Sequence, residues 1–239
     1  MNLMQIFIFI DYNNLVTKQK ENGIRDVVSR VVAQVEIPQA AKRIRCEARV
    51  YGGWYEDVTM TKRAQEVAVE IQNDFPAIIR TSNTGGHISR VESNASLAVS
   101  LLEDPANHLF NTYRRKDRPS SVRVKSKSQM ACSNVDCQIP ILRKAFKKGV
   151  CSVPACAKTA SMFIRTEQKL VDTMLTCDVV YSTELGCDRI AIVSSDDDFL
   201  PAIRTSIIRG AHVIRFNTKQ RRHNPVYVKQ KQRLIEKEL

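Results

Sequence analysis

The stretch IFIFIDYNN at residues 6–14 reads as an apolar strand that ends in a carboxylate, and IAIVSSDDDF at residues 190–199 repeats this pattern late in the chain. Apolar runs of this length are typical of strands that are buried on both faces of a parallel α/β sheet. The carboxyl ends of parallel strands meet at one edge, where the crossover loops leave room for a ligand. We therefore expect Asp11, Asp196 and Asp198 to lie close together.

Such a group of carboxylates requires something that neutralises it. Two carboxylates about 4 Å apart repel each other by roughly 4 kcal/mol at an effective dielectric constant near 20. The group must therefore take up protons or hold a cation. The sequence predicts a hard divalent metal ion at this edge of the sheet, because such ions prefer oxygen ligands.

Composition places the chain among ordinary folded proteins with an anionic partner. The 239 residues can bury one core and a small accessory element, and they carry a net charge of +12. No cationic stretch followed by a long apolar segment opens the chain, so we expect no signal peptide, no membrane span and a cytoplasmic location. The seven cysteines are an odd number, which favours reduced thiols or metal ligands over disulfides.

The positive charge is concentrated in two segments. Residues 114–148 contain eleven Lys or Arg against two Asp, and residues 215–239 contain eight against two Glu. Runs of this kind are also typical of a solvated face. In a chain that also has a cluster of aspartates, however, they favour nucleic-acid binding. The candidate nucleic-acid-binding residues are Arg114, Arg115, Lys116, Lys125, Lys127, Lys144, Lys147, Lys148, Arg221 and Arg222.

Strands and helices alternate along most of the sequence, which predicts a three-layer α/β/α sandwich with a mostly parallel sheet. Thr166 is expected to cap a helix, and Gly210 to end one. The stretch from the loop at 82–86 to residue 118 shows no clear pattern. The predicted strands are 5–11, 45–51, 77–80, 189–194 and 211–216, and the predicted helices are 23–36, 60–74, a helix from 166 and 198–209.

This alternation is interrupted once, so the sequence predicts three regions. Residues 1–118 and 166–225 form the main domain, residues 119–165 form a basic insertion, and residues 226–239 form a basic tail.

The insertion carries two equally spaced cysteine pairs, Cys132 with Cys137 and Cys151 with Cys156. Four thiolates from two short knuckles suit a tetrahedral structural zinc ion, and zinc binding would fold a segment that has little core of its own. The alternative is four unrelated thiols in a loop. Packing in the core or at its edge fits the remaining cysteines better than metal ligation does. These are Cys46, Cys177 and Cys187.

Asp172 is a fourth candidate carboxylate. In a βαβ unit the first turns of the helix lie at the carboxyl edge of the strands. Asp172 follows Thr166 by less than two turns and lies off the apolar stripe of its helix, so it can face Asp11 and Asp196. The alternative is a solvated residue that pairs with Lys169.

Three motifs, in order along the chain, resemble those of NYN domains, which belong to the PIN-like nuclease superfamily. FIDYNN at residues 9–14 is similar to the first-strand motif, and Lys169-x-x-Asp172 with Asp178 resembles the helical motif. VSSDDDF at residues 193–199 is similar to the Ser-Gly-Asp-x-Asp-Phe signature, with Ser195 in place of the usual glycine. The motifs span about two thirds of the chain; the cysteine-containing insertion is not part of the minimal domain.

The resemblance implies a metal-dependent ribonuclease. Asp11, Asp172, Asp196 and Asp198 would bind Mg²⁺ or Mn²⁺, and a bound water would attack the phosphodiester without a covalent enzyme intermediate. We expect single-stranded RNA as substrate, because an exposed backbone can enter a narrow acidic pocket. Asp197 is expected to point away from the site. The supporting residues would be Asn13, Asp178 and Ser194.

Other functions remain as alternatives. The main one is a nucleic-acid-binding or assembly module that does not cut, and the sequence leaves open RNA against DNA, the mode of cutting, and a monomer against a homo-oligomer. Asn13 stands where a haloacid-dehalogenase-type phosphatase needs a second aspartate, and neither a calcium loop nor a phosphate-binding loop is present. Trp54 and Tyr55 could stack on a base or cap the core.

Overall fold

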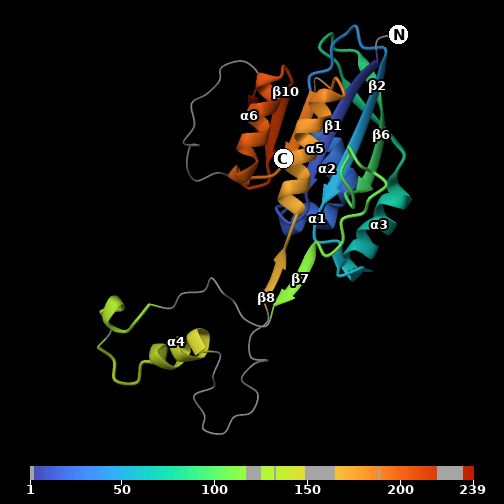
Figure 1. Cartoon of the computed structure of the whole chain (residues 1–239). Helices are drawn as coiled ribbons and strands as arrows, with labels where there is room; N and C mark the ends of the chain where they lie inside the picture. Colours follow the sequence, from blue (N-terminus) through green and yellow to red (C-terminus); the bar gives the residue numbers. More distant parts are fainter. Residues whose placement is uncertain (1–2, 117–124, 132, 149–164, 188, 220–233) are drawn as a thin grey trace. The chain divides into compact units, whose positions relative to one another are not determined.

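The computed structural model describes residues 3–116, 125–131, 133–148, 165–187, 189–219 and 234–239. The chain divides into two compact units, residues 1–112 with 169–239 and residues 113–168. The first unit is a mixed α/β domain, and the second contains the basic segment (Figure 1). Each unit is described by itself.

A curled, mostly parallel sheet of seven strands forms the first unit, in the order β11-β10-β9-β1-β2-β6-β5. Every neighbouring pair is parallel except β5 with β6. Six strands therefore end at the same edge. The strands are β1 Leu3–Asp11, β2 Arg43–Tyr51, β5 Ala77–Ser82, β6 Ile88–Leu97, β9 Arg189–Val193, β10 His212–Asn217 and β11 Leu234–Glu238.

Strand β1 is the centre of the sheet and contributes to both cores, because alternate side chains of a strand point to opposite faces. Ile6, Ile8 and Ile10 lie in one core, and Phe7 and Phe9 lie in the other. The first core includes buried residues of α2 and α3, and the second includes those of α5 and α6; α5 crosses in front of β1 in Figure 1. The helices are α1 Thr17–Asn22, α2 Ile24–Val32, α3 Lys62–Asp74, α5 Val171–Glu184 and α6 Leu200–Ile208.

A second, small sheet accompanies the large one. In the first unit, β3 (Tyr55–Glu56) pairs antiparallel with β4 (Thr59–Met60). The second unit contains the antiparallel pair β7 (Tyr113–Lys116) and β8 (Arg165–Gln168), and also α4 (Ile139–Lys148). Within the described part of the chain, no helix combines the length and the apolar character that crossing a membrane requires.

All five predicted strands are present, but the helix predicted to begin at Thr166 begins at Val171. Thr166 pairs with Arg115 in the β7–β8 ladder instead of capping the helix. Leu170, predicted for the apolar stripe, is the N-cap residue with φ 67° and is largely exposed. The corrected start moves Asp172 into the first turn of α5.

Two strands of the seven-stranded sheet lie where the sequence predicts none. Strand β6 falls in the segment without a clear pattern, because only two of its ten residues are buried. Strand β11 falls in the predicted basic tail and pairs parallel with β10. Short strands with few apolar residues carry little periodic signal, and only their neighbours in the sheet stabilise them.

Candidate active site

The candidate site lies at the carboxyl edge of the sheet, where β1, β9 and β10 end side by side. Val193 is in register with Ile10 on one side and with Phe216 on the other. Asp11 follows Ile10, and Ser194 follows Val193. Because Ile10 and Val193 are in register, Asp11 lies beside Ser194. Because Asp11 continues the alternation of Phe7 and Phe9, it faces the side of the sheet that α5 covers.

Asp11 is buried and has two hydrogen-bond donors. The Ser194 hydroxyl donates to Oδ2 at 3.0 Å and the Asn14 backbone N–H to Oδ1 at 3.3 Å. Burial raises the pKa of Asp11 to about 6, against the lowering effect of these two hydrogen bonds. The charges of Asp172 and Asp196 raise it further. The site therefore disfavours the charged carboxylate that a metal ligand requires, unless a cation is present.

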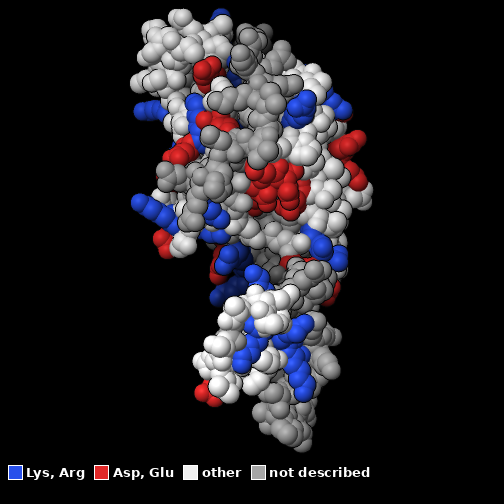
Figure 2. Space-filling model, turned by 90° about the vertical axis from the view of Figure 1, so that its left-hand side faces the viewer, with Lys and Arg blue, Asp and Glu red and all other residues white. Residues whose placement is uncertain are grey.

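Two of the other predicted ligands, Asp172 and Asp196, are electrostatic neighbours of Asp11, and Asp198 is a neighbour of Asp172. Asp196 caps the short 3₁₀ turn at Asp197–Phe199, where its side chain accepts a hydrogen bond from the Asp198 backbone N–H at 3.0 Å. Partial burial, followed by the charges of Asp196 and Asp198, raises the pKa of Asp172. The structure thus brings Asp172 and Asp196 near Asp11, and Asp196 and Asp198 near Asp172. Figure 2 shows a compact acidic patch on the face that it presents.

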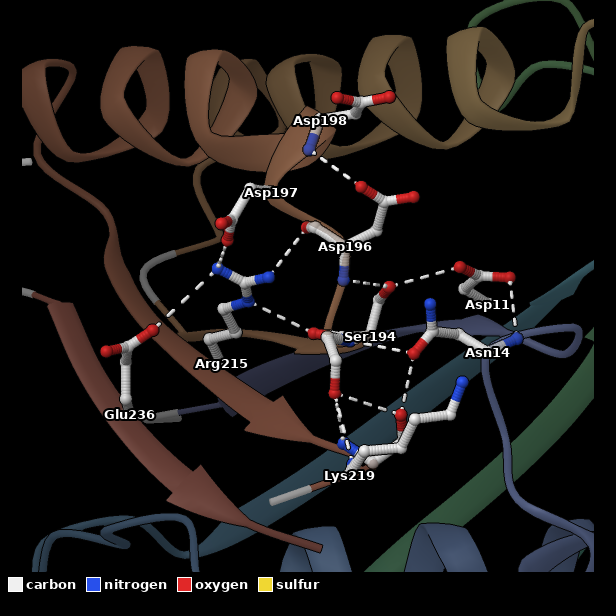
Figure 3. A network of polar contacts seen from close by, with 11 residues as sticks. Asp11, Asn14, Ser194, Asp196, Asp197, Asp198, Arg215, Lys219 and Glu236 are labelled. Carbon is white, nitrogen blue, oxygen red and sulfur yellow. Dashed lines mark hydrogen bonds and ion pairs between the residues drawn. The ribbon is translucent and has the colours of Figure 1, made fainter. Parts of the chain in front are cut away.

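A buried arginine holds the aspartate loop. Arg215 of β10 has 0% of its side chain exposed and donates to the carbonyl oxygens of Ser194 at 3.0 Å and Asp196 at 2.6 Å. Its guanidinium also bonds the Asp197 carboxylate at 2.9 Å and lies 3.7 Å from Glu236 of β11 (Figure 3). Asp197 thus points to Arg215, as expected for a residue outside the carboxylate group. In the sequence, Arg215 is only one of the charges in the C-terminal segment.

A second network joins the ends of β1, β9 and β10. The Asn14 side-chain oxygen accepts hydrogen bonds from the Ser195 N–H at 2.9 Å and the Thr218 hydroxyl at 2.6 Å. The Ser195 hydroxyl in turn accepts from the backbone N–H groups of Thr218 and Lys219. Ser195 stands where the family motif has glycine, and its hydroxyl makes hydrogen bonds that a glycine could not make. Neither Asn14 nor Thr218 was identified as a site residue from the sequence, although Asn14 is the last residue of the FIDYNN stretch.

Asp178, predicted to support the site, belongs to a different network. It is buried and accepts hydrogen bonds from the Tyr51 hydroxyl at 2.6 Å and the Leu102 N–H at 2.8 Å. Arg49 lies 3.2 Å from the same carboxylate. Burial raises the pKa of Asp178, while Tyr51, Leu102 and Arg49 act in the opposite direction. The supporting role is wrong, because these contacts direct its side chain to the end of β2 and not to Asp11.

The structure also places Asn13, Trp54 and Tyr55, and Trp54 follows the second of its two expected roles, since it packs in the core. Asn13 is exposed, and the hydrogen bonds to the site come from Asn14 instead. Trp54 cannot stack on a base, because its side chain is buried and its indole N–H donates to the Val50 carbonyl. Tyr55 is half-buried and makes an edge contact with Phe110.

The remaining cysteines differ in burial. Cys46 and Cys187 are buried, as expected, whereas Cys177 is exposed on α5 and does not pack in the core. Of the four predicted zinc ligands only Cys137 is described, and it is half-buried. The other three lie outside the described residues: Cys132, Cys151 and Cys156.

Most of the predicted nucleic-acid-binding residues belong to the second unit. Lys125 and Lys144 are exposed there, whereas Arg114 and Lys127 are half-buried. For four others only the backbone is described, in β7 and α4: Arg115, Lys116, Lys147 and Lys148. Arg221 and Arg222 lie outside the described residues.

The donor chemistry of the site fits a hard divalent cation, since all four carboxylates offer oxygen ligands. As they stand, however, the described residues contain no group of three or more His, Cys, Asp or Glu side chains that could hold a metal ion. The neighbouring aspartates thus raise the pKa of Asp11 and of Asp172, but the four side chains do not form a preassembled coordination shell. Comparisons with family models, curated proteins and solved structures found no match for this chain.

Proposed function

We propose that this protein is a metal-dependent nuclease that hydrolyses phosphodiester bonds in single-stranded RNA, with an NYN-type, PIN-like three-layer α/β/α domain. The observation that supports this most directly is that Asp11, Asp172 and Asp196 come together from three separate parts of the chain, with Asp198 near Asp172. Among the described residues, none of these four carboxylates forms an ion pair. Their charge is left for an external cation.

The residues of the chain would contribute position and charge. The Ser194 hydroxyl and the Asn14 N–H orient Asp11, and Arg215 fixes the loop that carries Asp196. When bound, Mg²⁺ or Mn²⁺ would supply an acidified water and stabilise negative charge on the phosphate oxygens. The four carboxylates would hold that cation.

The proposed substrate follows from the contrast between the site and the whole chain. A carboxylate pocket repels phosphates, but the chain has a net charge of +12 and the second unit is strongly basic. Lys and Arg on that unit would attract the nucleic acid through release of its condensed counterions. Cytoplasmic RNA is the proposed target, and DNA is the comparison substrate in the assay.

Cleavage of labelled single-stranded RNA and DNA with Mg²⁺ or Mn²⁺ tests this proposal. Asp196→Asn should lower the cleavage rate on the order of 100-fold. The neutral amide is a poorer ligand than the carboxylate and no longer balances the positive charge of the metal ion. Its dissociation constant for RNA should stay within about 2-fold of the wild-type value, since phosphate contacts are left in place. Asp26→Asn is the matched control, because Asp26 is a partly exposed aspartate on α2 whose ion pair is with Arg30. Equal cleavage by wild type and Asp196→Asn would contradict the proposal.

A second candidate is a nucleic-acid-binding module that does not cut. It is favoured by the lack, within the described residues, of a ready metal-holding group. In the same assay, wild-type protein that binds RNA with a steep salt dependence and never cleaves it would establish this alternative.

We also infer that Cys132, Cys137, Cys151 and Cys156 hold a structural zinc ion in the second unit. The spacing of the two pairs supports this, and thiolates are preferred zinc ligands. Elemental analysis of the purified protein should find one zinc per chain, and a variant with all four cysteines replaced by serine should contain none. Wild-type protein without stoichiometric zinc would contradict it.

A further inference from the structure

Two lysines from distant parts of the sequence lie next to each other at the carboxyl edge of the sheet. Lys20 is in the last turn of α1, and Lys219 follows β10. The buried side chain of Gln19 donates a hydrogen bond to the Thr218 carbonyl at 3.3 Å. This contact fixes α1 against the end of β10 and brings the neighbouring lysines to the same place.

Both lysines border the acidic site. The Lys219 backbone N–H donates to the Ser195 hydroxyl at 3.1 Å, one residue before Asp196 (Figure 3). The Lys20 ammonium lies 5.2 Å from the centre of the Tyr12 ring, and Tyr12 follows Asp11. The two cations thus adjoin the loops that carry two of the candidate metal ligands.

In the described part of the structure, Lys20 and Lys219 form no ion pair. Partial burial and the positive charges of Arg63 and Lys219 lower the pKa of Lys20, and the attraction of Asp11 opposes them only in part. Positive charge is therefore concentrated beside the carboxylates, in a place where an added anion would be favoured.

We propose that Lys20 and Lys219 form a phosphate-binding site of the first unit, which holds the backbone of a single-stranded nucleic acid next to the aspartates. This inference rests on the proposed function, because it places the substrate of that same site. A metal ion would occupy the carboxylates, and the lysines would bind an adjacent phosphate that the metal does not contact. The strand would then pass over the place where α1 meets the end of β10, beside the aspartates.

The test is binding of a fluorescent single-stranded oligoribonucleotide to the full-length protein at several salt concentrations, with EDTA present so that no cleavage occurs. Replacing both lysines by glutamine should raise the dissociation constant about 3- to 10-fold. The slope of log K against log[salt] should become shallower by about 0.7, since each phosphate contact to a single strand contributes about 0.7 and the two lysines share one phosphate. Lys18→Gln is the matched control, because it removes the same charge from an exposed position on α1 and should leave the slope unchanged.

Two further measurements separate this role from the alternatives. The variant with both lysines replaced by arginine should bind RNA like the wild type, because arginine keeps the positive charge. If any change at Lys20 or Lys219 disturbed the fold, the arginine variant would also bind RNA more weakly. If the lysines served only as counter-ions for the carboxylates, the glutamine variant would bind RNA normally and bind Mn²⁺ more tightly. That result, or a wild-type salt slope in the glutamine variant, would overturn the inference. Wild-type protein that binds RNA through these lysines but does not cut it would overturn only the proposed nuclease activity.

Discussion

Asp11 and Asp178 are both buried aspartates on the side of the sheet that α5 covers, yet their surroundings differ. Asp178 has a tyrosine hydroxyl, a backbone N–H and the Arg49 guanidinium as partners. Asp11 has one hydroxyl and one backbone N–H, and its nearest charged neighbours include two more carboxylates. Burial raises the pKa of both, but only at Asp11 do the neighbouring charges add to the rise.

The difference indicates what each residue does. A buried carboxylate with a cation and full hydrogen bonding is part of the fold, because the protein itself stabilises its charge. A buried carboxylate among like charges costs stability and is retained where an external cation or proton completes the site. The resemblance to a nuclease motif assigns both aspartates to the site, whereas their contacts separate them.

The largest expected effect is on folding. Asp178→Asn leaves the partly buried Arg49 without its carboxylate, and we expect the free energy of unfolding to fall by about 3 kcal/mol. Asp11→Asn removes a buried charge from a repulsive setting, so the free energy of unfolding at pH 7 should stay unchanged or rise. Urea denaturation in the presence of EDTA measures both. Equal destabilisation by the two variants would remove the distinction between these aspartates.

The next effect is on the pH dependence of stability without metal. The folded-state pKa of Asp11, about 6, is higher than the value of 3.8 for an unperturbed aspartate, so the folded protein binds more protons between these pH values. The free energy of unfolding should therefore fall as the pH rises through this window, by about 2 to 3 kcal/mol from Asp11. Asp172 and Asp178 contribute in the same direction.

The contribution of Asp11 is isolated by comparison with Asp11→Asn. Urea denaturation of both proteins between pH 4 and pH 7 should show a steeper decline for the wild type. Parallel pH profiles would mean that the pKa of Asp11 is not raised in the folded protein.

The smallest effect concerns the position of the site. Arg215→Lys keeps a positive charge but loses the planar group that bonds Ser194, Asp196 and Asp197 together. We expect the cleavage rate at saturating RNA to fall about 10-fold, because small displacements of a catalytic group are costly, while the dissociation constant for RNA stays unchanged. Arg209→Lys is the control, since Arg209 forms an exposed ion pair with Glu184 at the end of α6. A raised dissociation constant with an unchanged rate would show that Arg215 does not act through the loop.

The sequence by itself determined the strands that form the centre of the sheet and two of the three places from which carboxylates come. Residues 6–10 and 190–193 are apolar runs long enough to require burial, and the carboxylates that follow them must lie at the edge of the sheet. Asp172 was also identified, although its helix begins five residues later than predicted.

Only the tertiary structure decided which polar residues complete that edge. In the sequence, Arg215 is one of many basic residues. The pairing of β10 with β9 brings it into contact with the loop at Ser194–Asp197. Asp178 lies only six residues from Asp172, and it takes the packing of α5 against β2 to direct it to Tyr51. Strand β11 is stabilised by its neighbour and not by its own composition. These contacts join residues far apart in the chain, and the local patterns of apolar residues carry no information about them.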